Sequence, residues 1–423
     1  MGRFALSLLF IANCFAPCFS HARDLGLAEA EQRVEQGNRD VLAARRAIEA
    51  AGAGVLQADI RPNPVVSYNT SGISSNPGIG PGSLADKRID NVFRIDQVVE
   101  RGNKRELRVE VARGMERVAI NDATEVLRQQ VLVTRNAYAD LQQAQAKTEI
   151  LAGVAELFAG TYSAAQTRLK AGDLASADVA RVQVDYERSQ NELRVAQAEL
   201  ARAQFALAYL IADEAAAPSL RAIDPWPPAT PLDQGQMQRA NEQYVESRPD
   251  VLAAKARIEA TEKMRDLARS QRTRDVSVGA QFERYAGTQP ANSVGFGISV
   301  PLLIGNDFSG DIQRAEVDRY AALDALERVR AVAATEISRA ASDLRAAAER
   351  RTRYEGSLLE AARRSADAAE FAFKRGATSV LEVLDARRTL RAVQLEALAA
   401  RTEFSKAMHA WRASLQAPGA PLR

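Results

Sequence analysis

The sequence predicts a mainly α-helical protein with a small β part, built as a tandem repeat of long coiled-coil hairpins. The prolines, a duplicated order of short motifs and two pairs of alternating segments predict this class. The 15 prolines leave two long gaps, because none lies between Pro81 and Pro218 or between Pro301 and Pro418. Proline is excluded from helix interiors. The gaps are rich in Ala, Glu, Arg and Leu, so they are typical of long helices.

The two halves of the chain resemble each other. Four short motifs recur in the same order with small insertions: DVLAA at 40–44 and 250–254, IEA at 48–50 and 258–260, F-x-I at 93–95 and 296–298, and GN at 102–103 and 305–306. Such collinear matches indicate a tandem duplication. The predicted parts are a first repeat at 23–212, a Pro-rich linker at 213–235, a second repeat at 236–415 and a tail at 416–423.

Each repeat contains the same three kinds of helix. The expected ranges are 24–58 and 236–271 for a first helix, 104–171 and 310–375 for a long helix, and 176–212 and 378–414 for a returning helix. A long helix would span about 100 Å at 1.5 Å per residue. The returning helices carry apolar residues in steps of three and four from Val179 and from Val383, which is a coiled-coil pattern. Gly172 and Gly376 mark the hairpin tips, because glycine readily ends a helix in the left-handed conformation.

Two pairs of segments alternate apolar and polar residues and predict strands. They lie at 64–73 with 91–98, and at 275–285 with 293–301, each pair joined by a polar loop with Gly and Pro. This length and alternation are typical of outer-membrane β-barrel strands. Four strands cannot close a barrel, and an open edge is not tolerated in lipid. Either several chains combine, or the strands form a small soluble sheet against the helices.

The N-terminus predicts export. Arg3, an apolar stretch at 4–19 and Ser20-His21-Ala22 fit a signal peptide over residues 1–22. Its removal would take away both cysteines and leave a single histidine, His409. Lipidation would instead need cleavage before Cys14 or Cys18, where the preceding Asn and Pro fit poorly. We therefore expect no Cys/His metal site.

Catalysis and nucleic-acid binding are also not expected. No motif places a nucleophile beside a base, so no catalytic or cofactor-binding residue is predicted. Lys and Arg number 56 against 54 Asp and Glu. This balance gives no basic surface for nucleic acid.

Two motifs make a family resemblance specific. TSVLEVLDA at 378–386 resembles the second hairpin tip of the TolC-type outer membrane efflux family, the outer membrane factors of tripartite RND efflux systems. QVVERGNKR at 97–105 resembles the motif that follows a strand in the CzcC-like heavy-metal branch. That motif usually has two glycines before Lys-Arg, and Asn103 replaces one of them. With the duplicated architecture, the resemblance covers essentially the whole mature chain.

The resemblance implies a passive channel in the outer membrane of a Gram-negative bacterium that extends into the periplasm. It implies a homotrimer whose twelve strands form one transmembrane β-barrel and whose helices form an α-barrel. Its partners would be a periplasmic adaptor (membrane fusion protein), an inner-membrane RND pump and outer-membrane lipid. The implied substrates are divalent metal cations such as cobalt, zinc or cadmium. Multidrug efflux and type I secretion are alternatives within the family. A soluble periplasmic coiled-coil adaptor or scaffold is the alternative of another class.

The resemblance also implies two sets of functional residues. Glu382 and Asp385 would form an acidic periplasmic gate, with Asp178 and Arg181 at the equivalent places of the first repeat. The alternative is that these are ordinary solvated side chains beside a coiled-coil seam. The hairpin tips would dock the adaptor, or else serve only turn formation; the docking candidates are Arg168, Leu169, Gly172, Asp173, Leu174, Ser176, Lys374, Arg375, Gly376, Thr378 and Ser379.

Overall fold

The computed structural model describes residues 23–76, 78–83, 86–228, 241–286, 291–375 and 377–415. The expected signal peptide, the C-terminal tail, positions 229–235 of the linker and Gly376 lie outside the described residues. The chain divides into two compact units, and each draws on both repeats. We call them the hairpin unit (Met1–Val34, Val133–Pro228 and Arg350–Lys406) and the sheet unit (Glu35–Leu132, Ala229–Glu349 and Ala407–Arg423).

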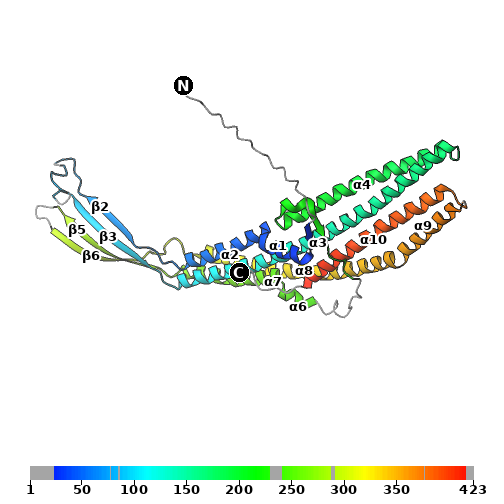
Figure 1. Ribbon diagram of the computed structural model, residues 1–423. Helices are drawn as coiled ribbons and strands as arrows, with labels where there is room; N and C mark the ends of the chain where they lie inside the picture. The colour runs from blue at the N-terminus through cyan, green and yellow to red at the C-terminus, as the bar shows by residue number, and fades with distance from the viewer. Residues whose placement is uncertain are drawn as a thin grey trace, which may run out of the picture. The chain divides into compact units, whose positions relative to one another are not determined.

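Two long helical hairpins run through the structure (Figure 1). The first consists of α3 (Lys104–Ala171) and α4 (Ser176–Leu210). In the second, α8 (Ser309–Arg353) continues through a π-helical turn, Tyr354–Leu358, into α9 (Leu359–Lys374), and α10 (Val380–Leu415) returns. Their tip halves lie side by side in the hairpin unit. Within the described part of the chain, no helix is both long and apolar enough to cross a membrane.

The π-helical turn is an interruption that the sequence did not reveal. Its Glu355 accepts hydrogen bonds from Arg351 at 3.0 Å and from Arg401 of α10 at 2.6 Å. Arg351 is buried and also donates to the carbonyl of Pro227 at 2.6 Å. Burial raises the pKa of Glu355, but the two arginines lower it by more, so the net pKa lies below its usual value. These contacts stabilise the turn, which is a rare departure from the regular α-helix.

The first helix expected in each repeat is divided in two, for a local reason. Asn38 separates α1 (Leu27–Gly37) from α2 (Arg39–Ala58), and its side chain accepts the N–H groups of Asp40 and Val41, at 3.0 and 3.3 Å. This is N-capping by a preferred residue. In the second repeat α6 (Asn241–Ser247) precedes α7 (Pro249–Ser270). Pro249 is favoured at the first position of a helix, where its missing N–H costs nothing.

The Pro-rich linker is partly ordered within the hairpin unit. It contains a 3-10 helix, Glu214–Ser219, and strand β4 (Leu220–Ala222), which pairs in parallel with β1 (Arg23–Leu25). The hydroxyl of Tyr138, on α3, lies 2.9 Å from the carbonyl of Leu25 and 2.8 Å from the carboxylate of Asp224. Burial raises the pKa of Tyr138, so its hydroxyl stays protonated. The tyrosine ties both strands to the long helix.

The sheet unit contains a four-stranded antiparallel sheet in the order β2-β3-β5-β6. The strands are β2 (Val65–Ser71), β3 (Asp90–Val99), β5 (Val276–Tyr285) and β6 (Ala291–Ser299). Tyr68 lies opposite Phe93, which lies opposite Phe282, which lies opposite Val294. The contact between β3 and β5 joins the two repeats into one sheet. The outer edges of β2 and β6 have no strand partner among the described residues.

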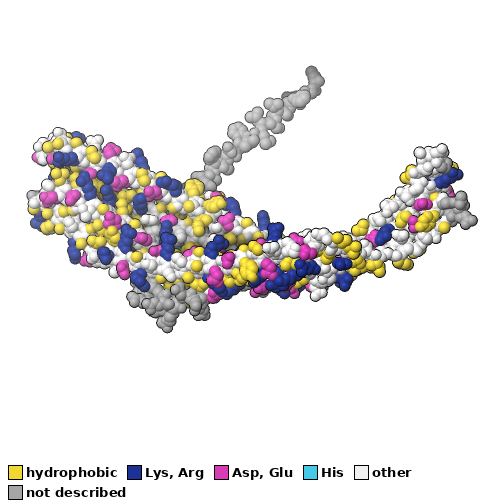
Figure 2. Space-filling model, turned by 180° about the vertical axis from the view of Figure 1, so that it is seen from behind, with side chains coloured by type: hydrophobic (Ala, Val, Ile, Leu, Met, Phe, Trp, Pro, Cys, Tyr) yellow, Lys and Arg dark blue, Asp and Glu magenta, His cyan; other side chains and the backbone are white. Residues whose placement is uncertain are grey.

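The sheet has one apolar and one polar face. The apolar face is exposed and includes Val66, Tyr68, Phe93, Ile95, Val278, Phe282, Val294, Phe296 and Ile298. Figure 2 shows these strands with hydrophobic side chains on the surface, and many charged side chains on the helices next to them. On the opposite face Arg94 donates to Asp96 at 2.6 and 2.8 Å and to Gln281 at 3.3 Å. Because this apolar face is exposed, it does not pack against the helices to form a core.

Ion pairs fix the helix ends next to the strands. The ammonium of Lys104 is buried and lies 2.8 Å from the carboxylate of Asp275. Arg108 donates to Glu100 at 2.9 Å, and this hydrogen bond lowers the pKa of Glu100. Burial raises the pKa of Asp275, but Lys104 and the N–H of Arg101 lower it by more. The pKa shifts of Glu100, Asp275 and Arg108 therefore all favour the charged forms.

The backbone before α3 explains the unusual motif found in the sequence. Gly102 and Asn103 both have positive φ angles, 75° and 56°. Asparagine is one of the few residues other than glycine that adopt this conformation routinely. Asn103 therefore preserves what a second glycine would supply. In the second repeat the residue directly before α8 is Phe308, which also has a positive φ angle, 59°.

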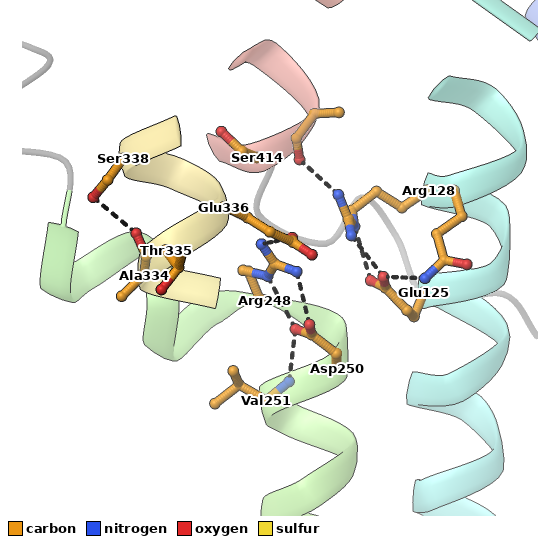
Figure 3. Close-up of polar contacts among 12 residues, drawn as sticks. Glu125, Arg128, Arg248, Asp250, Val251, Ala334, Thr335, Glu336, Ser338 and Ser414 are labelled. Carbon is orange, nitrogen blue, oxygen red and sulfur yellow. Dashed lines mark hydrogen bonds and ion pairs between the residues drawn. The ribbon is translucent and has the colours of Figure 1, made fainter. Parts of the chain in front are cut away.

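A buried arginine organises the core of the sheet unit (Figure 3). Arg248 is 2% exposed and lies between Asp250 at 2.7 Å and Glu336 of α8 at 2.8 Å. Burial lowers the pKa of Arg248, but the hydrogen-bonded carboxylate of Asp250 and the ion pair with Glu336 raise it by more. Beside this cluster, Arg128 donates to the carbonyl of Ala413 near the end of α10, at 3.2 Å. Arg248 and Arg128 thus connect α7, α8, α3 and α10 within one unit.

Candidate functional site

The first hairpin tip, at Gly172, has a tight backbone geometry. At the first tip Gly172 has φ 82°, and the N–H of Asp173 donates to the carbonyl of Arg168 at 2.9 Å. This is a helix end of the Schellman type. The residue that caps α4 is Ala175, which makes no side-chain capping bond. Ser176, a docking candidate, therefore has no capping role.

At the second tip, side chains of the turn make hydrogen bonds to the first turn of α10. The hydroxyl of Ser379 accepts the N–H of Glu382 at 3.4 Å, and the hydroxyl of Thr378 donates to the carboxylate of Glu382. Ser379 and Glu382 have the spacing of a capping box. That S-x-x-E pattern is visible in the sequence, and it gives Glu382 a structural contact in addition to any role in a gate.

The four predicted gate residues lie on the first turns of α4 and α10. Glu382 and Asp385 are exposed, whereas Leu384 between them is 3% exposed. Leu384 packs in a cluster with Phe158 and Ala165 of α3 and Val179 and Val182 of α4. This packing fixes the start of α10 on the first hairpin and leaves both carboxylates in solvent.

Arg181 does not join the two hairpins within this chain. It lies 3.6 Å from Asp178 on its own helix, and its side chain is 61% exposed. The pairs that do join the hairpins were missed from the sequence. Arg388 donates to both carboxylate oxygens of Asp185, at 2.6 and 2.7 Å, and Arg391 donates to Glu192 at 2.8 Å.

The acidic residues of α4 that form ion pairs near the tip follow a regular spacing. Asp178, Asp185 and Glu192 are seven residues apart on α4, next to its apolar seam. Charged side chains that flank a coiled-coil seam commonly pair with the neighbouring helix. The spacing was visible in the sequence, but the partner helix was not. Asp185 is also unusually buried, since only 8% of its side chain is exposed.

A groove opens between the two tips. It has a volume of about 680 Å³, and its lining includes the docking candidates Arg168, Leu174, Thr378 and Ser379, together with Asp178. Leu169, Gly172, Asp173, Ser176 and Arg375 do not line this groove. The side chain of Lys374 and all of Gly376 lie outside the described residues.

Aromatic rings hold two cations at the tips. The guanidinium of Arg168 lies 5.5 Å from the ring centre of Phe373, which joins α3 to α9. Arg375 lies 5.1 Å from the ring of Phe371 on its own helix. Such contacts orient a guanidinium without neutralising it. The groove therefore has an apolar wall with positive charge at its rim.

Metal ligands are not gathered in the described part of the chain. No group of three or more His, Cys, Asp or Glu side chains there could hold a metal ion. His409 is buried on α10.

Comparisons with known proteins agree with this architecture. A family model described as "Outer membrane efflux protein" matches residues 241–415. The chain is 24% identical over 399 residues to the cobalt-zinc-cadmium resistance protein CzcC of Cupriavidus metallidurans, covering 92% of this chain and 89% of that protein. Residues 241–415 of the chain therefore match the outer membrane efflux protein family. Known proteins of this family are channels and not enzymes, which confirms the expectation of a non-enzymatic protein.

Solved structures confirm the predicted fold class. The outer-membrane channel OprN superimposes with a TM-score of 0.74 at 23% identity, covering 93% of this chain and 90% of that chain. The outer membrane protein VceC from Vibrio cholerae gives a TM-score of 0.72 at 19% identity, covering 92% and 95%. The chain therefore has the TolC-like fold over nearly its whole length.

Proposed function

We propose that this protein is the homotrimeric outer-membrane channel of a tripartite efflux system that exports divalent metal cations. The sheet carries the proposal. Its apolar face is exposed and its β2 and β6 edges are unpaired in the described chain. A sheet edge is not stable in lipid unless strands close into a barrel. Three copies of four strands would pair every edge and turn the polar face, with Arg94 and Asp96, toward a lumen.

Cobalt, zinc and cadmium are the proposed cargo, because the CzcC relative is named for resistance to these metals. In a trimer, Glu382 and Asp385 would place six exposed carboxylates around the entrance. Rings of carboxylates attract cations and repel anions. The channel itself needs no tight metal site, because it conducts ions and does not store them.

The periplasmic tips would serve as both gate and docking site. Arg388–Asp185 and Arg391–Glu192 hold the two hairpins of one chain together just above the acidic residues. The groove between the tips offers an adaptor an apolar wall and the cation of Arg168. Filling that groove would compete with the hairpin–hairpin contacts and so favour opening. An inner-membrane RND pump would supply the energy.

Charge reversal tests the gate. We expect Glu382→Lys with Asp385→Lys to reduce cation selectivity of the purified channel in planar bilayers. Asp324→Lys with Glu327→Lys is the matched control, because it reverses an exposed i,i+3 acidic pair on α8, away from the tip. The gate assignment is wrong if the tip variant and the control conduct alike.

Complementation tests the cargo. A Gram-negative host that carries the matching pump and adaptor but lacks its channel should regain tolerance to cobalt, zinc and cadmium when this gene is supplied. Restored tolerance to dyes and antibiotics without metal tolerance would reassign the cargo. A monomer that stays soluble without detergent would instead support the periplasmic adaptor.

A further inference from the structure

Two arginines, Arg101 and Arg274, lie just beyond the helix-side ends of β3 and β5. Val99 of β3 pairs with Val276 of β5 at the last rung of the ladder. Each arginine lies two residues beyond this rung, and the same register extended that far would set Arg101 opposite Arg274. The N–H of Arg101 donates to the carboxylate of Asp275 at 3.0 Å, so the two segments remain adjacent beyond the paired part of β3 and β5. If the strand alternation extends to these positions, both arginines lie on the apolar face.

These two cations are not neutralised by the protein. Both side chains are exposed, and neither has an ion-pair partner among the described residues. The nearby carboxylates are already engaged: Asp275 with Lys104, Glu100 with Arg108 and Asp59 with Arg105. Like charges directly opposite on neighbouring strands are destabilising. A shared anion would remove that repulsion.

The surface beside the arginines is apolar and continues past the end of β6. Beyond β6 the alternation continues through Val300, Leu302 and Ile304, which are 40%, 70% and 87% exposed. The β5–β6 register, continued in the same way, sets Leu302 opposite Arg274. A molecule with an anionic group and apolar chains would therefore contact the arginines and this apolar segment together.

We propose that Arg101 and Arg274 bind the phosphate of a phospholipid headgroup at the membrane rim of the sheet, with the acyl chains on Val300, Leu302 and Ile304. This rests on the proposed function, in which the strands cross the outer membrane. Arginine suits the site because its planar fork donates two parallel hydrogen bonds to phosphate oxygens. The site would fix the depth of the trimer in the inner leaflet.

The test measures binding of short-chain phosphatidylglycerol to the full-length trimer in a neutral detergent. Native mass spectrometry counts retained lipid, and melting temperature reports stabilisation. The variant is Arg101→Gln with Arg274→Gln. Its matched control, Arg328→Gln with Arg363→Gln, removes two equally exposed helix arginines that have no ion-pair partner in the described chain. The single variant Arg274→Gln serves if the double variant does not assemble.

We expect the wild type and the control to bind the lipid alike, and the double variant to bind it at least about tenfold more weakly, because two charge-assisted hydrogen bonds are lost. Diacylglycerol with the same chains should not stabilise the wild type. Equal lipid affinity in the double variant overturns the proposal. Full competition by inorganic phosphate also overturns it, since the source would be a free anion.

Channel recordings separate this inference from the proposed function. If the wild type conducts in planar bilayers but the double variant binds lipid as tightly as the wild type, only the headgroup site is wrong. If the wild type neither forms trimers nor inserts into bilayers, both the channel and the headgroup site are wrong.

Discussion

Breaking the Arg388–Asp185 pair should open the channel. The variant Arg388→Gln removes two hydrogen bonds, at 2.6 and 2.7 Å, that hold α10 against α4. It also leaves the carboxylate of Asp185 unpaired, although only 8% of that side chain is exposed. The pair therefore stabilises the packed arrangement of the two hairpins.

The size of the effect follows from this geometry. Hydrogen bonds to charged groups contribute about 1.5–3 kcal/mol. The side chain of Arg388 is 49% exposed. Solvent screening therefore reduces the contribution to about 1–2 kcal/mol per chain. If three chains open together, the closed state loses about 3–6 kcal/mol, which shifts the equilibrium by a factor of roughly 10² to 10⁴.

The assay is single-channel recording of purified trimers in planar bilayers. Open probability should rise in Arg388→Gln, and less in Asp185→Asn, because the freed arginine can extend into water whereas the freed carboxylate stays buried. Arg339→Gln is the matched control, since its pair with Asp343 is exposed at both ends and spans one helix. The reasoning fails if Arg388→Gln gates like the wild type, or if Arg339→Gln has the same effect.

Three further predictions concern stability, each read from the thermal melting of the purified protein. Arg248→Met should cost about 1–2 kcal/mol, because Asp250 and Glu336 lose their buried partner while 22% and 51% of their side chains remain exposed to solvent, and an unchanged melting temperature would contradict the ion-pair assignment. The pKa of Glu355 is lowered in the folded protein from its usual value of 4.5. Its contribution to the free energy of unfolding is therefore complete above pH 4.5 and is lost as the pH falls through the lower pKa of the folded state. Glu355→Gln should therefore flatten the loss of stability in acid, and an equally steep loss would refute this. An alanine Cβ at Gly102 would lie 2.8 Å from Thr273, at a backbone φ of 75°. Gly102→Ala should cost about 1–2 kcal/mol from the left-handed backbone alone, while Asn103→Gly should be neutral or stabilising. Equal melting of these two variants would contradict the backbone argument.

The sequence predicted elements whose signals are local and repeated. Val179, Val182 and their successors define the seam of α4, and Gly172 marks the turn, because both effects act within one or two helix turns. The strands were equally visible, since alternation along Val66–Thr70 and Phe93–Ile95 needs no knowledge of the partner strand. The breaks at Asn38 and Pro249 are also local signals, and they were overlooked within longer helical patterns.

Other features depend on contacts between distant segments. Strands β1 and β4 have three residues each, and Tyr138 of α3 stabilises them, so neither could be recognised alone. The π-helical turn depends on Arg401, which lies on another helix. At the candidate site the sequence identified acids at the tip, but the partner of Asp185 is set by how two hairpins pack. The charge at a tip can be predicted from one segment of the sequence, whereas the ion-pair partner of a residue on another helix cannot.

The ion pairs between the hairpins also show why the two repeats differ. At the offset that relates Asp178 to Glu382, Arg388 corresponds to Val184 and Asp185 corresponds to Thr389. Two copies of the first hairpin could not form this pair, because each has Val184 where Arg388 would be needed. Where the two hairpins meet, α4 presents the acids Asp185 and Glu192 and α10 presents the bases Arg388 and Arg391, so charge favours contact between a first and a second hairpin over contact between two first hairpins. A ring of alternating hairpins needs this distinction, and its closing contacts can then be broken at one kind of interface while the other stays intact.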